Sequence, residues 1–562
     1  MASARFIQVI LPLKLDWEPY YRVPEGLDVK LGSRVRVVFA NAFYVGCVSE
    51  VDVTPSLDPA KILPVEGLEE NLPSITPEEI RFWRQLALYY LCTVGEVYKA
   101  AYPSATNHKS KLAIPESVPP EGQFQLTAAQ QKAADSIQKA FQQGKTVLLK
   151  GVSGSGKTEI AFKLALDTLR VGKSALILTP DTKSLEGRFP SALLFSSGLS
   201  AARRKVVAEK LRIGEPCLVL GTRAALFLPF RSLGLIVVDS EHDSSYKQDA
   251  PAPRYHARES AIMLAGVHGA NVLLSSATPS LESAYNALCG RFQLIELTER
   301  FHKGQAEVEI IDTGAEWRKR GMAGSFSFKL IDRIRETLAA GGQVLLLGPR
   351  RAYAQGRKME EEVLEYFPEA RIAILDMGPV DGEYDIYIGT AFATRSFAPA
   401  NLRLVGLVIG DSMLARQDFR ADEHALQLME QFRGRCERFV IQTREPRHPV
   451  FTHLNGDYVA AMLEERRIAG YPPFTRMVKV QLKDKNEQRR NYLAKELAAA
   501  LGREGLKLEG PYSLEQETAE LRILLARDKS LVQKKAAMAK TITAFETSRK
   551  YTGHIIIDVD PV

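Results

Sequence analysis

Continuous apolar runs recur through the middle of the chain, and stretches with helical spacing separate them. An uninterrupted apolar run fits a strand that is buried on both faces, and alternation of such strands with helices is typical of a parallel α/β sheet. The pattern therefore predicts one α/β lobe over residues 123–300. Its predicted strands are TVLLK (146–150), ALILTP (175–180), CLVLGT (217–222), LGLIVVD (233–239) and ANVLLSSAT (270–278).

A second series of the same kind follows and predicts a second α/β lobe over residues 301–455. The fold class is therefore α/β, with two lobes in tandem. The predicted strands of the second lobe are VEIID (308–312), QVLLLGP (343–349), ARIAILD (370–376), YDIYIGT (384–390), LRLVGLVIGD (402–411) and FVIQT (439–443).

The two ends of the chain have different patterns. Residues 1–65 contain short runs rich in β-branched and aromatic residues, which predict a small β-barrel or sandwich. Residues 70–104 read as a short helical segment in which Thr76 is a plausible N-cap. Proline and glycine in 105–122 predict a linker, and the mixed pattern of 456–562 predicts a small α+β domain.

The net charge of the chain excludes few classes of function. The chain has 74 Lys and Arg against 67 Asp and Glu, which gives a formal net charge of +7. This balance permits binding to nucleic acid without requiring it, because local clustering of charge matters more than the total.

The five cysteines and the N-terminus exclude several classes of protein. No two cysteines form a CxxC pair, so we expect free thiols rather than a zinc ribbon or a disulfide framework. The N-terminus lacks the pattern of a secretory signal, and no apolar run approaches the about 18 residues of a membrane span. We therefore expect a cytoplasmic protein with no membrane partner.

The sequence GVSGSGKT, residues 151–158, is a phosphate-binding loop of the G-x4-G-K-[ST] type. A predicted strand precedes it and a helical pattern follows it, which is the context that the motif needs. Lys157 is expected to reach the β- and γ-phosphates of ATP, and Thr158 to bind Mg²⁺. The predicted nucleotide-binding residues of the loop are Gly151, Val152, Ser153, Gly154, Ser155, Gly156, Lys157 and Thr158.

Asp239 ends a predicted strand, where a magnesium-binding aspartate belongs in a nucleotide-driven motor. Helicases of the second superfamily carry Asp-Glu-x-His at this point, and the Glu activates the attacking water. This chain has Ser240 in that position and Glu241 one residue later. Neighbouring side chains of an extended segment point to opposite faces, so Glu241 does not simply replace the missing base. ATP binding and ATP hydrolysis are therefore separate questions here.

With these residues in view, most of the chain resembles the PriA family of primosomal replication-restart helicases. The resemblance implies a 3′-DNA-binding barrel, a short winged-helix-like segment, two RecA-like lobes and a C-terminal domain. It also implies 3′→5′ DNA unwinding, with forked and single-stranded DNA, single-stranded-DNA-binding protein and primosome loaders as partners. The segments that carry it are YYRVPEG (20–26), LTAAQ (126–130), GTRAALFLPF (221–230), DSEHDSSYKQ (239–248), PRYHARE (253–259), SSATPSLES (275–283), GDSMLARQDFRADEHALQLMEQFRGR (410–435), RIAGYPPFTRMV (467–478) and IIIDVDPV (555–562).

The resemblance assigns roles to several further residues. Gln130 is expected to read adenine. The family sequence QVAGRAGR corresponds to QFRGRCER (431–438), so Arg435 and Arg438 are expected to meet the γ-phosphate. Glu437 replaces a glycine there and is able to pair with Arg438. Together with Lys157 and Asp239, these two arginines form the predicted catalytic set.

Candidate DNA contacts lie in two places. Tyr20 and Tyr21 either stack on bases or serve as core and rim tyrosines of the small barrel. The segment that contains Tyr246, Lys247, Arg254, Tyr255 and Arg258 either touches single-stranded DNA or is a solvated charged loop.

Two departures from the family bear on function. The family carries a zinc module of eight cysteines after a segment similar to GPRRAYA (348–354), and this chain has no such insertion, so we predict no zinc. Family members usually have Phe-Asp-Tyr where this chain has Pro19-Tyr20-Tyr21. Two hypotheses follow, namely a restart helicase with impaired hydrolysis and a non-catalytic scaffold that binds ATP and DNA.

Overall fold

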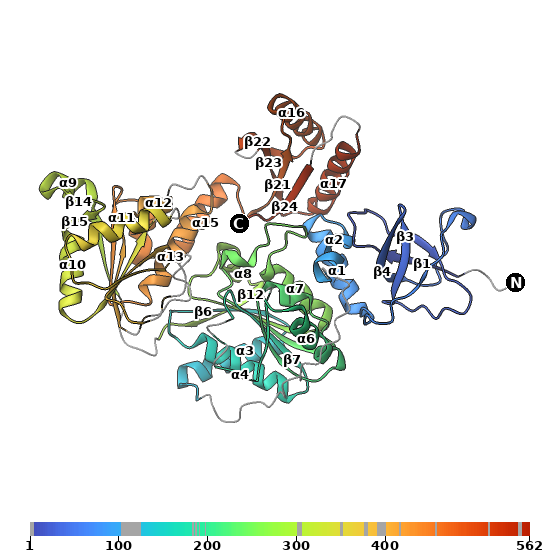
Figure 1. The fold of residues 1–562 in the computed structure, drawn as a ribbon, viewed down its shortest axis with the longest axis horizontal. Helices are drawn as coiled ribbons and strands as arrows, with labels where there is room; N and C mark the ends of the chain where they lie inside the picture. Colours follow the sequence, from blue (N-terminus) through green and yellow to red (C-terminus); the bar gives the residue numbers. More distant parts are fainter. Residues whose placement is uncertain are drawn as a thin grey trace.

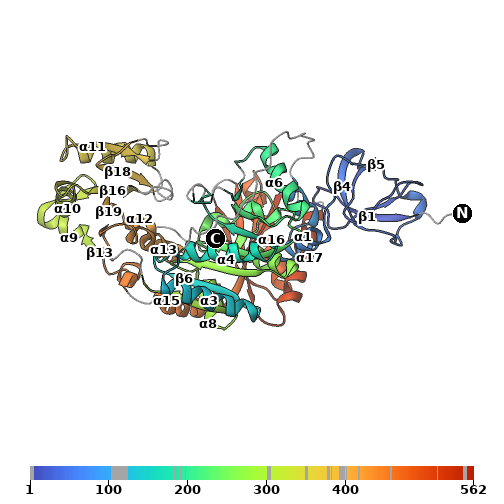
Figure 2. The same cartoon turned by 90° about the horizontal axis from the view of Figure 1, so that it is seen from below.

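The fold is known from a computed structural model, which divides into four parts. In Figure 1, lobe 1 lies between lobe 2 and the N-terminal barrel, and the C-terminal domain lies above lobe 1. Figure 2 places lobe 2 and the barrel at opposite ends. The predicted linker lies outside the described residues, which are 5–102, 125–182, 185, 188–189, 191–196, 198–299, 306–348, 352–375, 380, 382–390, 399, 401–414, 418–455, 458–514, 517–548 and 554–562.

The N-terminal part is an antiparallel sheet of order β2-β1-β4-β3-β5. Alternating apolar residues such as Ile7, Val9, Val35 and Val37 fill its core, as the period of two in a strand requires. The strands are β1 (Phe6–Ile10), β2 (Tyr20–Arg22), β3 (Arg34–Phe39), β4 (Ala42–Glu50) and β5 (Gly67–Leu68).

Two helices, α1 (Pro77–Tyr90) and α2 (Val94–Ala101), follow the barrel. Thr76 caps α1 as predicted, because its hydroxyl accepts from the Glu79 N–H while the Glu79 carboxylate accepts from the Thr76 N–H. Helix α1 packs against α7 (Ala257–His268) and so joins the barrel to lobe 1.

Lobe 1 is a parallel sheet of order β12-β6-β11-β10-β7-β9-β8. The five predicted strands are all present, and β8 and β12 are additional. The strands are β6 (Thr146–Gly151), β7 (Ser174–Leu178), β8 (Leu193–Phe195), β9 (Leu218–Gly221), β10 (Leu233–Asp239), β11 (Asn271–Ser276) and β12 (Phe292–Leu297). The other helices are α3 (Ala128–Gln142), α4 (Lys157–Arg170), α6 (Ala201–Ile213) and α8 (Leu281–Leu288).

Lobe 2 is a parallel sheet of order β13-β20-β19-β16-β18-β17, built from the six predicted strands. They are β13 (Glu307–Asp312), β16 (Gln343–Gly348), β17 (Ile372–Ile374), β18 (Ile386–Thr390), β19 (Leu402–Leu407) and β20 (Arg438–Thr443). The remaining elements are α9 (Thr313–Arg320), β14 (Met322–Ala323), β15 (Phe326–Ser327), α10 (Phe328–Ala339), α11 (Ala352–Leu364), α12 (Asp411–Leu414), α13 (Ala421–Arg433) and α14 (Pro449–Thr452). Helix α15 (Tyr458–Ala469) then leads from lobe 2 to the C-terminal sheet.

The C-terminal domain is an antiparallel sheet of order β22-β23-β21-β24 with two helices. Its elements are β21 (Thr475–Lys483), α16 (Glu487–Arg503), β22 (Lys507–Leu514), β23 (Thr518–Ala526), α17 (Leu531–Thr547) and β24 (His554–Val559). The predicted fold class is therefore confirmed. Within the described ranges, no helix combines the length and the apolar character needed to cross a membrane.

Candidate nucleotide site and interlobe junction

The phosphate-binding loop joins β6 to α4. Gly154 (φ 76°) and Gly156 (φ 87°) adopt left-handed backbone conformations, which glycine tolerates and which let the loop turn back on itself. Lys157 Nζ donates to the carbonyl oxygens of Gly151 at 2.7 Å and Val152 at 3.1 Å. The ammonium group is thus held inside the loop, beside the N-terminus of α4, where a helix favours anions.

Asp239 lies at the carboxyl end of β10 and faces Lys157. Burial lowers the pKa of Lys157, and the nearby Asp239 carboxylate opposes that shift. Burial raises the pKa of Asp239, and Lys157 opposes that shift in turn. Each group therefore favours the charged form of the other. Thr158 is half-buried in the first turn of α4.

The residues present fit ATP with Mg²⁺. The Ser155 hydroxyl is buried without a hydrogen-bond partner, and a side chain at Gly151 would lie 2.6 Å from that hydroxyl. The loop therefore has room only for glycine at its start. Thr158 and Asp239 supply the oxygen ligands that Mg²⁺ prefers. Among the described residues, no group of three or more His, Cys, Asp or Glu side chains is arranged to hold a metal ion.

Gln130 lies directly beneath the loop. Its Nε2 donates to the Ser155 carbonyl oxygen at 3.0 Å, and its Oε1 accepts from the Thr127 N–H at 2.9 Å. Both ends of the amide are therefore engaged with the protein. Recognition of adenine by this residue stays a prediction.

The segment after Asp239 turns sharply at Ser240, whose φ of 51° is left-handed. The turn carries Glu241 away from the loop and into the protein, where its carboxylate is fully buried. It accepts hydrogen bonds from the Ser280 N–H (2.7 Å), the Ser280 hydroxyl (2.9 Å), the Ser283 hydroxyl (2.9 Å) and Arg258 Nη1 (2.9 Å). A carboxylate with four donors has no capacity left to activate a water, which agrees with the expectation that Glu241 does not replace the missing base.

His242 lies on the other side of this turn. One of its ring nitrogens, Nδ1, is 2.7 Å from the hydroxyl of Ser276 at the end of β11. Burial lowers the pKa of His242, so the neutral imidazole is favoured. The contact ties the segment after β10 to its neighbouring strand.

The predicted DNA-contacting loop has a different role in the structure. The ring of Tyr246 is 1% exposed, and its hydroxyl donates to the Asp239 carbonyl oxygen at 2.6 Å. Lys247 Nζ donates to Val559 O at 2.7 Å and pairs with the carboxylate of Asp558 at 2.7 Å. Both predictions of DNA contact are therefore wrong, because these side chains fix the end of β10 to the C-terminal domain.

The second half of that loop is also mostly buried. Tyr255 packs edge-on against Phe227, with ring centroids 5.2 Å apart. Arg258 is buried between Glu241 and Glu259, to which its guanidinium lies at 2.9 Å and 2.6 Å. The predictions for Tyr255 and Arg258 are wrong for the same reason. Arg254 is half-buried, and its contact with DNA stays a prediction.

The two tyrosines of the barrel differ from each other. Tyr21 is buried, its hydroxyl donates to Val38 O at 3.0 Å, and burial raises its pKa to about 12. The core alternative therefore holds for Tyr21, and its predicted stacking on DNA is wrong. Tyr20 is half-buried on the opposite side of β2 and stays a candidate for stacking.

Lobe 2 touches the phosphate-binding loop at Gly434, just after α13. A side chain at this position would place its Cβ 2.4 Å from the Cβ of Ser153. The lobes are therefore in direct contact at the loop. Arg435 follows immediately, and burial lowers its pKa.

Arg438 lies elsewhere, at the amino end of β20. Its guanidinium pairs with Glu336 at 2.9 Å and with Glu307 at 3.5 Å, both in lobe 2. Its contact with phosphate is not present in this arrangement of the lobes and stays a prediction. The expected pairing of Glu437 with Arg438 is wrong, because Glu437 faces Arg403 at 3.9 Å.

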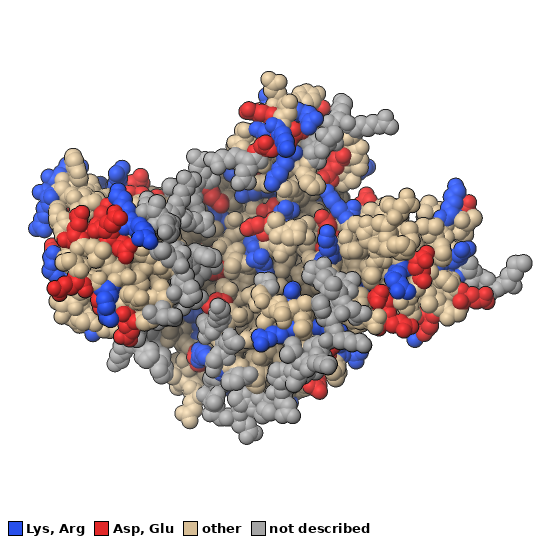
Figure 3. Space-filling model, viewed as in Figure 1, with Lys and Arg blue, Asp and Glu red and all other residues tan. Residues whose placement is uncertain are grey.

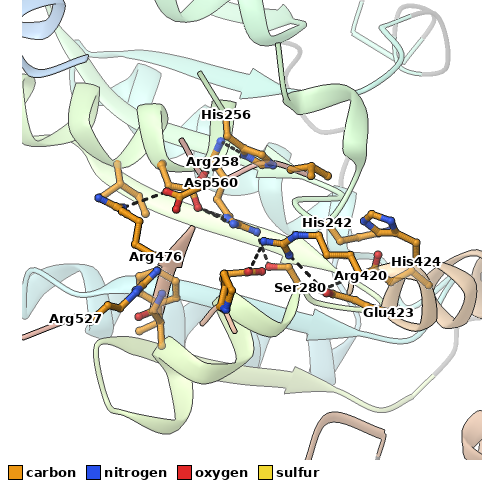
Figure 4. A pocket seen from close by; sticks show the side chains of 18 of the residues that line it. His242, His256, Arg258, Ser280, Arg420, Glu423, His424, Arg476, Arg527 and Asp560 are labelled. Atoms are coloured by element: carbon orange, nitrogen blue, oxygen red, sulfur yellow. Dashed lines mark hydrogen bonds and ion pairs between the residues drawn. The ribbon is translucent and has the colours of Figure 1, made fainter. Parts of the chain in front are cut away.

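A buried ionic junction joins the two lobes and the end of the chain (Figure 4). Arg420 pairs with Glu282 of lobe 1 at 2.6 Å and donates to Pro561 O at 3.2 Å. Glu423 accepts from the Leu281 N–H at 2.9 Å and pairs with Arg466 at 2.7 Å. Burial alone would raise the pKa of Glu282, but Arg420 outweighs this effect and holds that pKa well below its ordinary value.

The junction surrounds a polar cavity of about 120 Å³. The C-terminal domain contributes Arg476, which pairs with Asp560 at 3.1 Å, and α1 contributes Tyr89, whose hydroxyl lies 3.0 Å from that carboxylate. Sequence reasoning missed these residues. Charged residues in a helical pattern look solvent-exposed, and the partners of Arg420 and Tyr89 are more than a hundred positions away in the sequence.

Comparisons with known proteins identify three of the domains described above. Three family models match: the 3′ DNA-binding domain of PriA over residues 8–103, the DEAD/DEAH box helicase over 127–287, and the primosomal protein N C-terminal domain over 467–562. The first of these spans the barrel together with α1 and α2.

Two relatives that match most of this chain are replication restart proteins. The replication restart protein PriA of Rickettsia felis is 28% identical, with 99% of each chain covered. That of Treponema pallidum is 31% identical, with 72% of this chain and 75% of the relative covered. A solved structure of the DUF1998 helicase MrfA bound to DNA is 12% identical, with a TM-score of 0.41 over 77% of this chain and 66% of that one. The PriA relatives and the three family models show that the chain belongs to the PriA family of replication restart proteins, with a DNA-binding, a helicase and a C-terminal domain.

Proposed function

We propose that the chain is an ATP-driven 3′→5′ DNA helicase that restarts stalled or abandoned replication forks, with hydrolysis slowed by Ser240. The observation that carries this proposal is the meeting of the two lobes at the phosphate-binding loop. Lys157 and Asp239 face each other in lobe 1, and Gly434 of lobe 2 packs on Ser153. A nucleotide held between the lobes is thus able to change how they sit together.

Residues of both lobes have distinct roles in binding ATP with Mg²⁺. Lys157 turns from the carbonyl oxygens of the loop toward phosphate oxygens, and Thr158 and Asp239 hold the magnesium ion. Arg435 enters from lobe 2 beside the loop. Bound ATP with Mg²⁺ supplies the phosphoryl group whose hydrolysis drives the motor.

Ser240 sets the limit on turnover. A serine hydroxyl does not accept a proton at neutral pH, and Glu241 is held by Arg258, Ser280 and Ser283. Loss of a positioned general base typically costs about 10² to 10⁴ in rate. Slow hydrolysis is therefore expected. Ser240 and the missing zinc module favour the scaffold hypothesis, and the phosphate-binding loop with Arg435 and Arg438 favours the enzyme.

The proposal extends to organisation and partners. Forked and single-stranded DNA are its nucleic-acid partners, and single-stranded-DNA-binding protein and primosome loaders are its protein partners in the cytoplasm. We divide the chain into a DNA-binding β domain (1–65), a winged-helix-like segment (70–104), a linker (105–122), lobe 1 (123–300), lobe 2 (301–455) and a C-terminal domain (456–562).

The test is steady-state ATP hydrolysis with and without forked DNA, with Lys157→Ala as the control. We expect slow hydrolysis that DNA stimulates and that the variant loses. ATP binding without any turnover, in the presence or absence of DNA, would instead establish the scaffold. DNA affinity is measured in parallel as a function of salt, and it should fall steeply because phosphate contacts release counterions.

A further inference from the structure

An open groove lies along the carboxyl edge of the lobe 2 sheet, apart from the phosphate-binding loop. It has a volume of about 840 Å³. Helix α9, which follows β13, forms one wall, and residues that follow β19 and β20 form the floor and the other wall. We call this feature the α9 groove; it is lined by Trp317, Arg318, Ser325, Asp411, Gln442 and Arg444, among others.

Trp317 in α9 is unusual for its exposure. The helix buries none of its residues, and the indole of Trp317 is 67% exposed. By contrast, Trp83 in α1 is 1% exposed and fills the core. A large aromatic ring that is mostly exposed is available for contact with a ligand.

Positive charge surrounds this ring. Arg318, Lys319 and Arg320 occupy the last turn of α9, and Arg444 lies across the groove. Figure 3 shows Lys and Arg gathered over the part of lobe 2 where Figure 1 places α9. In the part of the chain that the structure describes, no carboxylate lies within 4.0 Å of the charged groups of Arg318, Lys319 or Arg444.

Asp411 is the acidic residue that lines the groove. Both of its carboxylate oxygens accept from the backbone N–H of Arg444 at 3.1 Å. The Thr443 hydroxyl also donates to this carboxylate. These neutral donors hold the Asp411 carboxylate in place, and the Arg444 side chain is exposed. The groove therefore presents an aromatic face and unpaired cations together.

We propose that the α9 groove binds a segment of single-stranded DNA, with Trp317 stacked on a base and Arg318 and Arg444 in contact with phosphates. An aromatic platform beside basic residues is how proteins hold single strands without reading their sequence. The proposal rests on the proposed role in DNA handling and adds to it a contact outside the matched DNA-binding domain. An acidic protein segment is the alternative occupant, and the experiment below separates the two.

Tryptophan fluorescence gives a direct readout, because the chain has only three tryptophans. Trp83 is buried, and Trp17 is removed by Trp17→Phe, so that Trp317 is the exposed reporter. Titration of this full-length variant with an oligothymidylate should quench its emission. Addition of Trp317→Ala should abolish the quenching and weaken binding about five- to a hundredfold, as expected for loss of one stacked base.

Charge reversal tests the phosphate contacts. Arg318→Glu combined with Arg444→Glu should weaken oligothymidylate binding at least tenfold and reduce the salt slope by about two, one for each contact. The matched control is Lys358→Glu in α11, which is 68% exposed and pairs with Glu362. It should leave both the affinity and the slope unchanged.

The outcomes separate this proposal from the proposed function. Unchanged quenching and affinity in the groove variants, in a protein that still binds forked DNA, would overturn the groove and leave the function standing. Quenching by a poly-glutamate peptide but not by oligothymidylate would also overturn it, in favour of a protein occupant. Failure of the unmodified protein to bind any DNA would contradict the proposed function itself.

Discussion

The guanidinium of Arg420 in lobe 2 lies 2.6 Å from the carboxylate of Glu282 in lobe 1, and both side chains are buried. The same guanidinium donates to the carbonyl oxygen of Pro561, one residue from the end of the chain. One side chain thus joins both lobes to the C-terminal domain. The lobes are held at a defined distance, and that distance decides whether residues of lobe 2 reach the phosphate-binding loop.

Removal of this arginine should be costly. We expect Arg420→Ala to lower the free energy of unfolding by about 3–5 kcal/mol, because it leaves the buried carboxylate of Glu282 without its ion-pair partner. The measurement is the thermal unfolding midpoint, with Arg335→Ala as the control. Arg335 pairs with Asp332 on the exposed face of α10, so its loss should leave the midpoint unchanged. Equal midpoints for the two variants would show that the junction contributes nothing.

The junction should also respond to pH through Glu282. Arg420 holds the pKa of Glu282 below its unfolded value, so the stabilisation is fully present above about pH 4.5 and is lost as the pH falls below that value. Glu282→Gln removes this dependence. The difference in melting temperature between the native protein and the variant should therefore shrink between about pH 5 and pH 3. A constant difference over this range would contradict the assignment.

A substitution at Gly434 tests the contact between lobe 2 and the phosphate-binding loop. Gly434→Ala would place a methyl group 2.4 Å from the Cβ of Ser153, so the lobes must separate. We expect weaker ATP binding and slower hydrolysis with little change in melting temperature. The control is Gly266→Ala in α7, where no atom lies within 4 Å of the new methyl group. It should leave activity unchanged and raise stability slightly, by about 0.5–1 kcal/mol. Identical ATP binding by the two variants would argue against the contact.

A substitution at Tyr246 distinguishes two roles for this residue, namely structural support of the nucleotide site and contact with DNA. Tyr246→Phe removes the hydrogen bond to the Asp239 carbonyl oxygen and should cost about 1 kcal/mol of stability. Affinity for single-stranded DNA, measured by fluorescence anisotropy, should not change, because the ring is buried. A weaker affinity in a folded variant would restore the role that the sequence suggested.

The strands of both lobes were predictable because parallel strands buried on both faces read as continuous apolar runs. Strand β12 was not predicted, since FQLIEL is an edge strand in which Leu297 is the one buried residue. Strand β8 has only three residues. The phosphate-binding loop was predictable because its chemistry lies within eight consecutive residues.

The surroundings of the site were not predictable in the same way. The segment around Tyr246 and Lys247 has the composition of a DNA-binding loop, and nothing local shows that it is buried. The carbonyl oxygen that accepts from Lys247 belongs to Val559, 312 residues further along the chain. Such partners are fixed by tertiary packing. The sequence therefore indicated the residues of the nucleotide site, but it gave the wrong role for Tyr246 and Lys247, which support that site.

We propose that this protein binds ATP at residues 151–158 and turns it over slowly because Ser240 stands where a general base is needed. The direct test is the DNA-stimulated rate of ATP hydrolysis in Ser240→Glu compared with the native protein, with ATP affinity measured alongside. We expect the hydrolysis rate to rise by about 10² or more at unchanged ATP affinity. An unchanged or lower rate in a variant that still binds ATP and DNA would contradict it.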